Sequence, residues 1–121
     1  MSKYLYILEN RKVVKAGDFD DWCAWSNNEE NKRVSLTEMG EIEVSTVFLA
    51  MSLPVYNHIK GEWQENYFET TVLKRGILEY RVLSKTWKEA EKKHKDTVKE
   101  YEPKKITEAK VLTTKTNVYE K

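Results

Sequence analysis

Few residues of this 121-residue chain have the types and spacing that chemistry requires. The chain contains two histidines, His58 and His94, and one cysteine, Cys23. Zinc sites need cysteine and histidine ligands in short paired spacings, which these three distant residues do not supply. Cys23 has no base near it in the sequence, so it is interpreted as a small core residue rather than a nucleophile. We therefore expect no catalytic residue, no metal, no cofactor and no enzymatic activity.

Anion and hard-cation sites are also weakly indicated. The four glycines are scattered and form neither of the familiar glycine-rich phosphate motifs. Glu38, Glu41 and Glu43 lack the pattern of a calcium loop, which favours a solvated strand face. The lysines of residues 85–105 are interleaved with acidic residues. This favours a solvated helix face, with a phosphate-contacting face as the weaker alternative.

Residues 52–66 hold the best candidate for a contact site. This segment contains a proline and a glycine and has no hydrophobic period, so it is predicted to be an irregular loop. Loops of that length are uncommon in compact domains unless they are functional or disordered. Aromatic side chains are frequent anchors at interfaces. An alternative, that the tryptophan folds back over the sheet edge, is left open. The candidate binding residues are Tyr56, His58, Ile59 and Trp63.

The rest of the sequence predicts the elements that position this segment. Two short strands are expected within residues 3–16, and a short helix follows with Asp18 as its N-cap. Phe19 is the first of the residues expected on the buried face of that helix. Alternating apolar residues predict a hairpin over 33–51 and a second over 67–83, each turned at a glycine.

The clearest element is a helix over residues 86–101. Thr86 and Glu89 have the spacing of a capping box, in which each side chain satisfies a backbone donor of the other residue. Residues 103–121 are predicted to be an extended strand or a loosely attached tail. The elements together predict a single domain over 1–121 of α+β class. Its sheet is antiparallel and hairpin-built, and it packs against one C-terminal amphipathic helix plus a short N-terminal helix.

His94 lies on the apolar stripe of the C-terminal helix, between Ala90 and Val98. No second histidine or cysteine lies at helical spacing from it, so a catalytic role would have no partner. We predict a structural histidine that is hydrogen-bonded to a strand hydroxyl, such as that of Thr46 or Thr70.

The composition narrows the class of partner. Lysine and arginine number 21 and the acidic residues 20, which gives a net charge of +1. That balance provides no overall attraction to nucleic acid or to a membrane, and neither is expected as a partner. The sequence shows no signal peptide and no run of about 18 apolar residues. We therefore expect a cytosolic protein.

Five phrases of the sequence occur together in a known group of proteins. They resemble, in the same order, a family of small proteins that bacteriophages and prophages encode and for which no activity is established. The resemblance covers roughly residues 19–98, and residues 50–52 and 73–76 depart from its pattern. The phrases are Trp22-x-x-Trp25, Thr37-Glu38-x-Gly40, Val44-Ser45-Thr46-Val47-Phe48-Leu49, Phe68-Glu69-Thr70-x-Val72 and Thr86-Trp87-x-Glu89-Ala90-x-x-x-His94.

The resemblance implies a phage origin and expression in the cytoplasm of an infected bacterial host. Since no catalytic or metal constellation is visible, the preferred function is a non-enzymatic protein that binds a host protein. Inhibition of a host defence component is the narrower form of this hypothesis. The alternative is a protein that sequesters a small ligand or nucleotide, and a weaker one is a virion or structural accessory protein. A closed pocket lined by Trp, Tyr and Lys would favour sequestration, whereas an exposed patch over 56–63 would favour protein binding. Homo-oligomerisation is left open.

Overall fold

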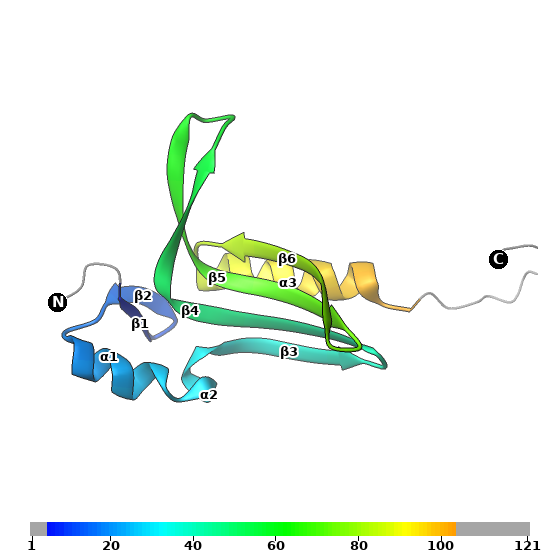
Figure 1. Cartoon of the computed structure of the whole chain (residues 1–121), viewed down its shortest axis with the longest axis horizontal. Coiled ribbons are helices and arrows are strands. Elements are labelled where there is room, and N and C mark those ends of the chain that lie inside the picture. Colours follow the sequence, from blue (N-terminus) through cyan, green and yellow to red (C-terminus); the bar gives the residue numbers. More distant parts are fainter. Residues whose placement is uncertain (1–4, 104–121) are drawn as a thin grey trace, which may run out of the picture.

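The computed structural model describes residues 5–103 as a four-stranded antiparallel sheet with a long helix across one face (Figure 1). A small hairpin and two short helices lie at one end. The elements are β1 (Tyr6–Glu9), β2 (Lys12–Lys15), α1 (Phe19–Ser26), α2 (Glu29–Lys32), β3 (Arg33–Met39), β4 (Ile42–Asn57), β5 (Glu62–Lys74), β6 (Ile77–Ser84) and α3 (Trp87–Tyr101). The predicted α+β class is confirmed. The strand or tail predicted at 103–121 lies outside the described residues, apart from Pro103.

Tight turns at two glycines connect the strands of the sheet, which pair in the order β3-β4-β5-β6. The turn from β3 to β4 contains Gly40, whose φ is +62°. The turn from β5 to β6 contains Arg75 and Gly76, with φ values of +53° and +81°. Positive φ at such positions matches the twist of the flanking strands, and glycine adopts it without steric cost. Both predicted glycine turns are confirmed.

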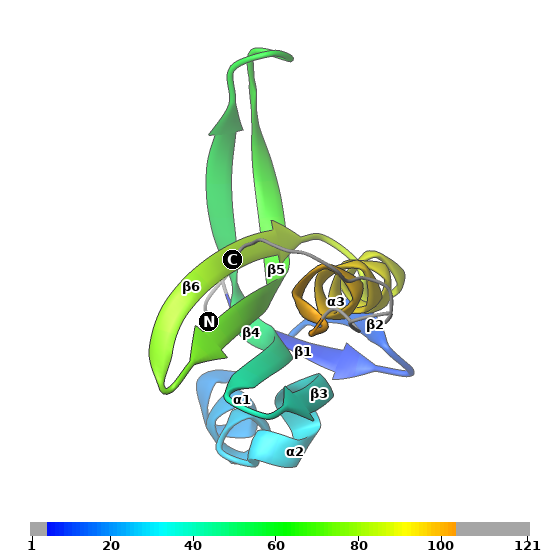
Figure 2. The same ribbon diagram turned by 90° about the vertical axis from the view of Figure 1, so that its right-hand side faces the viewer.

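The core lies between α3 and one face of the sheet. Helix α3 contacts all four strands, and Figure 2 shows it end-on within the curve of the sheet. Alternate residues of β4 and β5 point toward it, because successive side chains of a strand alternate between faces. Ala90 of α3 is fully buried against them. The buried residues on this face of the two strands are Val44, Thr46, Phe48, Ala50, Phe68, Thr70 and Val72.

The start of α3 confirms the predicted capping pair in part. Thr86 Oγ1 accepts a hydrogen bond from the backbone N of Glu89 (3.1 Å). In return, Glu89 Oε1 accepts from the backbone N of Lys85 (3.1 Å), one residue before the expected donor. Both bonds satisfy backbone donors at the start of the helix, where no helical partner is available.

His94 lies in a row of threonine hydroxyls between α3 and the sheet. The residue is only 4% exposed. Its Nδ1 is 2.8 Å from Thr46 Oγ1, and its Nε2 is 2.9 Å from Thr37 Oγ1. Thr46 Oγ1 is in turn 2.7 Å from Thr70 Oγ1. The predicted hydrogen bond to Thr46 is present, and Thr70 is connected to the ring through it.

Helix α1 attaches to the sheet differently from the sequence prediction. Asp18 Oδ1 accepts from the backbone N of Asp21 (2.8 Å), which confirms the predicted N-cap. Phe19, expected on the buried face of this helix, is 59% exposed. Trp22 and Ser26, expected on the same face, do lie against the core or are buried. Trp25 packs against the core as well, with its ring edge-on to Phe48 at a centroid distance of 5.7 Å.

Replacing Trp22 with phenylalanine is expected to lower the free energy of unfolding by about 1 kcal/mol. The indole Nε1 of Trp22 donates a partly buried hydrogen bond to the carbonyl O of Ala50 (2.8 Å). Phenylalanine keeps an aromatic ring but leaves that carbonyl without its donor. Urea denaturation measures the change. Trp63→Phe, at an exposed indole, is the matched control and should change stability by less than about 0.5 kcal/mol. Equal effects of the two substitutions would contradict this role for Trp22.

Residues 52–66 form a hairpin, and the prediction of an irregular loop is wrong. Strand β4 continues to Asn57 and β5 begins at Glu62, with regular pairing from Leu53–Asn66 to Asn57–Glu62. This hairpin, residues 52–66, is called the arm below; it projects from the sheet as the tall green ribbon of Figure 1. Its strands extend past the part of the sheet that α3 covers. Neither face of the arm is therefore buried, and its sequence does not alternate in polarity.

Candidate binding arm

A bulge at the base of the arm directs it away from the sheet. Between the last sheet pair and the first arm pair, β4 contributes residues 49–52 whereas β5 contributes only Tyr67. Ala50 has a φ of +65°, and Met51 forms a bridge to Leu5 near the N-terminus. Extra residues in one strand bend that strand and increase its twist. The bridge between Leu5 and Met51 and the hydrogen bond from Trp22 Nε1 to the carbonyl O of Ala50 hold the bend in place.

Hydrogen bonds also organise the tip of the arm. Asn57 Oδ1 accepts from the backbone N of Ile59 and of Lys60, each at 2.9 Å. The backbone N of Gly61 donates to the carbonyl O of Asn57 (2.8 Å). Gly61 has a φ of +69°, a conformation that glycine adopts readily. The backbone of the tip is therefore held by its own bonds, while the side chain of Ile59 is 97% exposed.

The arm brings together the four residues that the sequence predicted as a contact site. Tyr56 and Trp63 are directly opposite each other on its two strands, with ring centroids 5.4 Å apart. The ring of His58 lies edge-on to Tyr56 at 4.9 Å, and Ile59 follows at the tip. Trp63 is 67% exposed and does not fold back over the edge of the sheet. The side chains instead form a continuous exposed face.

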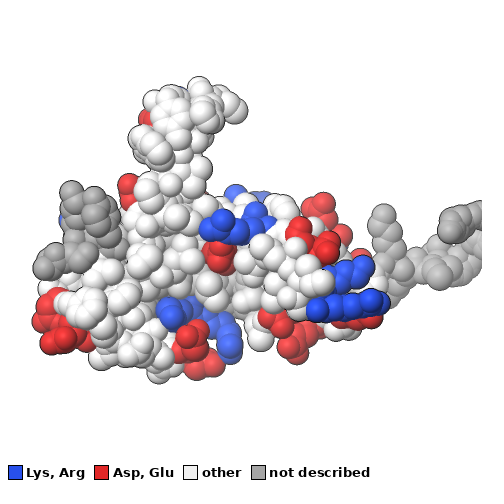
Figure 3. Space-filling model, viewed as in Figure 1, with Lys and Arg blue, Asp and Glu red and all other residues white. Residues whose placement is uncertain are grey.

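The surface of the arm is largely uncharged. Figure 3 shows it as a mostly white projection above a body that carries blue and red patches. Charged residues of the arm are confined to Lys60, Glu62 and Glu65. Glu65 is engaged locally by a hydrogen bond from the hydroxyl of Ser52. A protruding hairpin with exposed aromatic and aliphatic side chains and few charges has the composition of the core of a protein interface.

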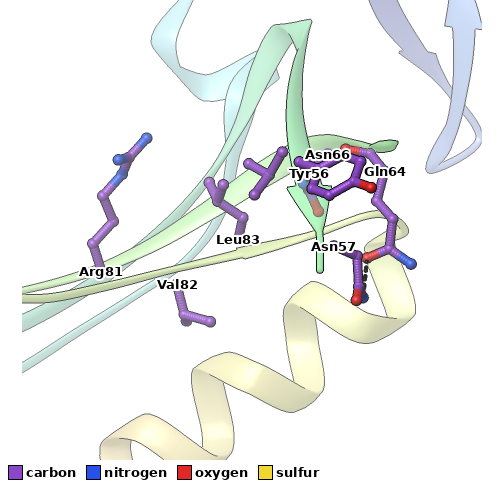
Figure 4. A pocket seen from close by; sticks show the side chains of 8 residues that line it. Tyr56, Asn57, Gln64, Asn66, Arg81, Val82 and Leu83 are labelled. Atoms are coloured by element: carbon purple, nitrogen blue, oxygen red, sulfur yellow. Dashed lines mark hydrogen bonds between the residues drawn. The ribbon is translucent and has the colours of Figure 1, made fainter. Parts of the chain in front are cut away.

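An open groove lies between the arm and β6, and Tyr56 of the aromatic pair is among the residues that line it. It has a volume of about 450 Å³ and is formed by residues 55–57, 64 and 66 of the arm and 81–83 of β6 (Figure 4). Asn57 Nδ2 donates to Gln64 Oε1 across it (3.3 Å). The guanidinium of Arg81 is paired with the carboxylate of Glu69. The groove therefore presents amides and aliphatic groups rather than a free cation.

Sequence reasoning missed several residues of this region. Val55 is 44% exposed on the arm, and Arg81 and Leu83 reach the groove from β6. A usable signal was the spacing of Asn57 and Gly61, since both residue types are frequent in tight turns. Pro54 argued against this turn, because proline is rare within strands. In a two-stranded arm, however, each strand has a free edge, and a proline there interrupts no ladder of hydrogen bonds. The contribution of β6 had no local signal, because the strand meets the arm only in the folded chain.

Other kinds of site receive less support from the described residues. Within residues 5–103, no group of three or more His, Cys, Asp or Glu residues is placed to hold a metal ion. None of the helices in that range is long and apolar enough to cross a membrane. Comparison of the chain with protein-family models, with curated proteins and with solved structures gave no match. Inferences about function therefore depend on the geometry and chemistry of the chain itself.

Proposed function

We propose that this chain is a non-enzymatic binding protein that contacts another protein through the arm. The observation that carries this proposal is the exposure of four apolar side chains on one projecting hairpin, Val55, Tyr56, Ile59 and Trp63. Exposed aromatic residues are costly to keep in water and are frequent hot spots when a partner covers them.

The arm is also well suited to binding without reorganisation. Its base is bonded to the body, its tip is closed by Asn57, and its central aromatic rings are in contact with each other. A preorganised surface loses less conformational entropy when it binds, which leaves more of the contact energy as affinity. Two-stranded arms of this kind reach into concave surfaces that a flat sheet cannot enter.

The partner we propose is a protein of the bacterial host, and the narrower form is a component of host defence. The proposal of a host protein as partner follows from the resemblance of the sequence to phage-encoded proteins and from the neutral, apolar chemistry of the arm. The groove beside the arm gives little support to nucleotide sequestration at this place. Its only arginine is already paired with Glu69, and neither lysine nor tryptophan lines it. A virion or structural accessory role is the weaker alternative.

Affinity capture from the lysate of the bacterial host tests the proposal. The tagged chain is expected to retain a host protein that the double variant Tyr56→Ala, Trp63→Ala no longer retains. Loss of one such anchor typically costs about 2–4 kcal/mol of binding free energy, or roughly a 30- to 1000-fold weaker complex. The double variant should keep the thermal unfolding of the parent, because both rings lie outside the core.

Phe19→Ala is the matched control, since it removes an exposed aromatic ring from the body instead of the arm. It should capture the same partner as the parent chain. Equal capture by the arm variant would show that the arm is not the contact surface. Recovery of the chain in purified phage particles, with no host protein captured, would favour the virion alternative.

A further inference from the structure

A second pocket lies at the end of the sheet where α3 begins, and Tyr67, at the base of the arm, forms part of its wall. The β1–β2 hairpin lies beside this end of the helix in Figures 1 and 2. The pocket has a volume of about 340 Å³. Its lining combines apolar and aromatic side chains with three basic ones, two from the β1–β2 hairpin and one from the segment before α3. These residues are Arg11, Lys12, Val13, Tyr67, Lys85, Thr86 and Trp87.

The three basic side chains of this pocket have no acidic partner among residues 5–103. Ion pairs in that part of the chain involve other lysines and arginines, such as Lys92 with Asp96. Glu9 lies opposite Lys12 in the register of the β1–β2 hairpin but forms no ion pair with it, and Glu89 accepts from the backbone N of Lys85 at the start of α3. Three unpaired cations around one pocket produce a local positive potential that attracts an anion, although the chain as a whole is nearly neutral.

The basic and aromatic groups of the pocket are held in a defined arrangement. The guanidinium of Arg11 lies over the ring of Trp87, 5.0 Å from the ring centroid. Phe68 meets the ring of Trp87 edge-on at a centroid distance of 6.3 Å. Tyr67 meets the ring of Tyr6 edge-on at 4.9 Å. Aromatic walls suit a planar ring, and the cations beside them suit an anionic group attached to that ring.

Backbone strain marks Arg11 as an unusual residue for its position. It has a φ of +66° in the turn between β1 and β2, after Asn10 with a φ of +51°. Hairpin turns of this type strongly prefer glycine at the second position, because a side chain there is unfavourable. Arg11 therefore occupies a position where glycine would be less strained, and its side chain lines the pocket.

We propose that this pocket binds a small aromatic anion of the size of a nucleoside monophosphate. The planar ring would contact the walls formed by Val13, Tyr67 and Trp87, and the anionic group would lie among the three cations. A phosphate dianion matches the number of cations better than a carboxylate does. The volume suits one nucleotide and is small for a longer oligomer.

Tyr67 adds a neutral donor to this chemistry. Burial, the hydrogen bond with Tyr6 and the charges of Tyr6 and Glu65 raise the pKa of Tyr67 to about 12. The phenol is therefore protonated at neutral pH and adds no negative charge to the pocket. The site shares none of these residues with the exposed aromatic face of the arm, so this inference goes beyond the proposed protein-binding function.

Calorimetric titration with adenosine 5′-monophosphate tests the inference on the full chain at low salt. We expect a dissociation constant below about 1 mM, within the range of weak metabolite sites. Adenosine and inorganic phosphate, titrated separately, should each bind at least about tenfold more weakly, because each lacks one half of the proposed contacts. No binding of the nucleotide would overturn the inference. Equal binding of either fragment would also overturn it, since the pocket would then not recognise a ring and an anion together.

Matched variants locate the site. Arg11→Gln and Lys85→Gln should each weaken nucleotide binding by about tenfold, as expected for one charge-assisted contact. Arg75→Gln is the control for Arg11, because Arg75 also has a positive φ in a hairpin turn but lies outside the pocket. Lys88→Gln is the control for Lys85 on the same segment. Unchanged binding by both pocket variants would overturn the assignment. Trp63→Ala should bind the nucleotide normally, which separates this site from the arm.

Discussion

Replacement of Phe48 by alanine is expected to lower the free energy of unfolding by about 3–5 kcal/mol. Phe48 is only 1% exposed, and its ring belongs to the buried core cluster that also contains Phe68 and Ala90. It contacts Trp25 of α1 at a centroid distance of 5.7 Å and Phe68 of β5 at 5.3 Å. Truncation leaves a cavity beside two rings, that of Trp25 from α1 and that of Phe68 from the neighbouring strand.

Chemical denaturation of the parent chain and of two phenylalanine variants measures this effect. Phe19→Ala removes the same side chain from a site that is 59% exposed, and it should change stability by less than about 0.5 kcal/mol. A cost under about 1 kcal/mol for Phe48→Ala would contradict the role of this ring in the core.

His94→Ala is expected to lower the free energy of unfolding at neutral pH by about 1–3 kcal/mol. The substitution removes the ring that bonds to both Thr37 and Thr46, whose hydroxyls lie within 2.9 Å of the two ring nitrogens, and it leaves Thr46 bonded to Thr70. A neutral imidazole donates through one nitrogen and accepts through the other, which matches a hydroxyl on each side. Buried hydroxyls that lose a partner carry the cost of their desolvation.

The same histidine should make the stability of the parent chain depend on pH. Burial lowers the pKa of His94 from its ordinary value of 6.5. The unfolded chain therefore takes up a proton at this ring at a higher pH than the folded chain. Stability from the neutral ring is fully present above about pH 6.5 and is lost as pH falls from there toward the lower pKa of the folded state. The slope contributed by one such group is at most about 1.4 kcal/mol per pH unit.

Denaturation of the parent and of two histidine variants between pH 7.5 and 5.5 tests this dependence. His94→Ala should lose this part of the slope, whereas His58→Ala, at an exposed histidine of the arm, should retain it. Lys95, Lys99 and Glu102 flank the opening beside His94 and are present in all three proteins, so their titration cancels in the comparison. The same slope in the parent and in His94→Ala would contradict the assignment.

Much of the sheet could be predicted because its local signals agree with its packing. Residues from Val44 to Ala50 alternate because one side of β4 faces α3, and Gly40 and Gly76 supply turns that the paired strands need. The position of His94 was predictable for the same reason, since helical periodicity places its ring over the strands. At these positions the spacing of apolar residues in the sequence matches the spacing of buried side chains in the structure.

Predictions failed where burial does not follow from a local period. The arm has no element beneath either face, so the residues around Pro54 carry no alternation to read. In α1 the choice between Phe19 and Trp25 as the buried ring is decided by the distant Phe48. The basic pocket combines Arg11 with Lys85, which are distant in sequence and meet only after the β1–β2 hairpin packs beside α3. Only tertiary packing brings such residues together.

The order of strands in the sheet has a consequence for how the chain folds. Each strand from β3 to β6 pairs with its neighbour in sequence, so every connection in the sheet is a short loop. Closing short loops costs little entropy, and proteins dominated by such local contacts fold quickly. On a ribosome, the sheet can form hairpin by hairpin as the chain emerges. Its apolar face is covered only when α3 follows, so the growing chain is most prone to aggregate just before Tyr101 is released.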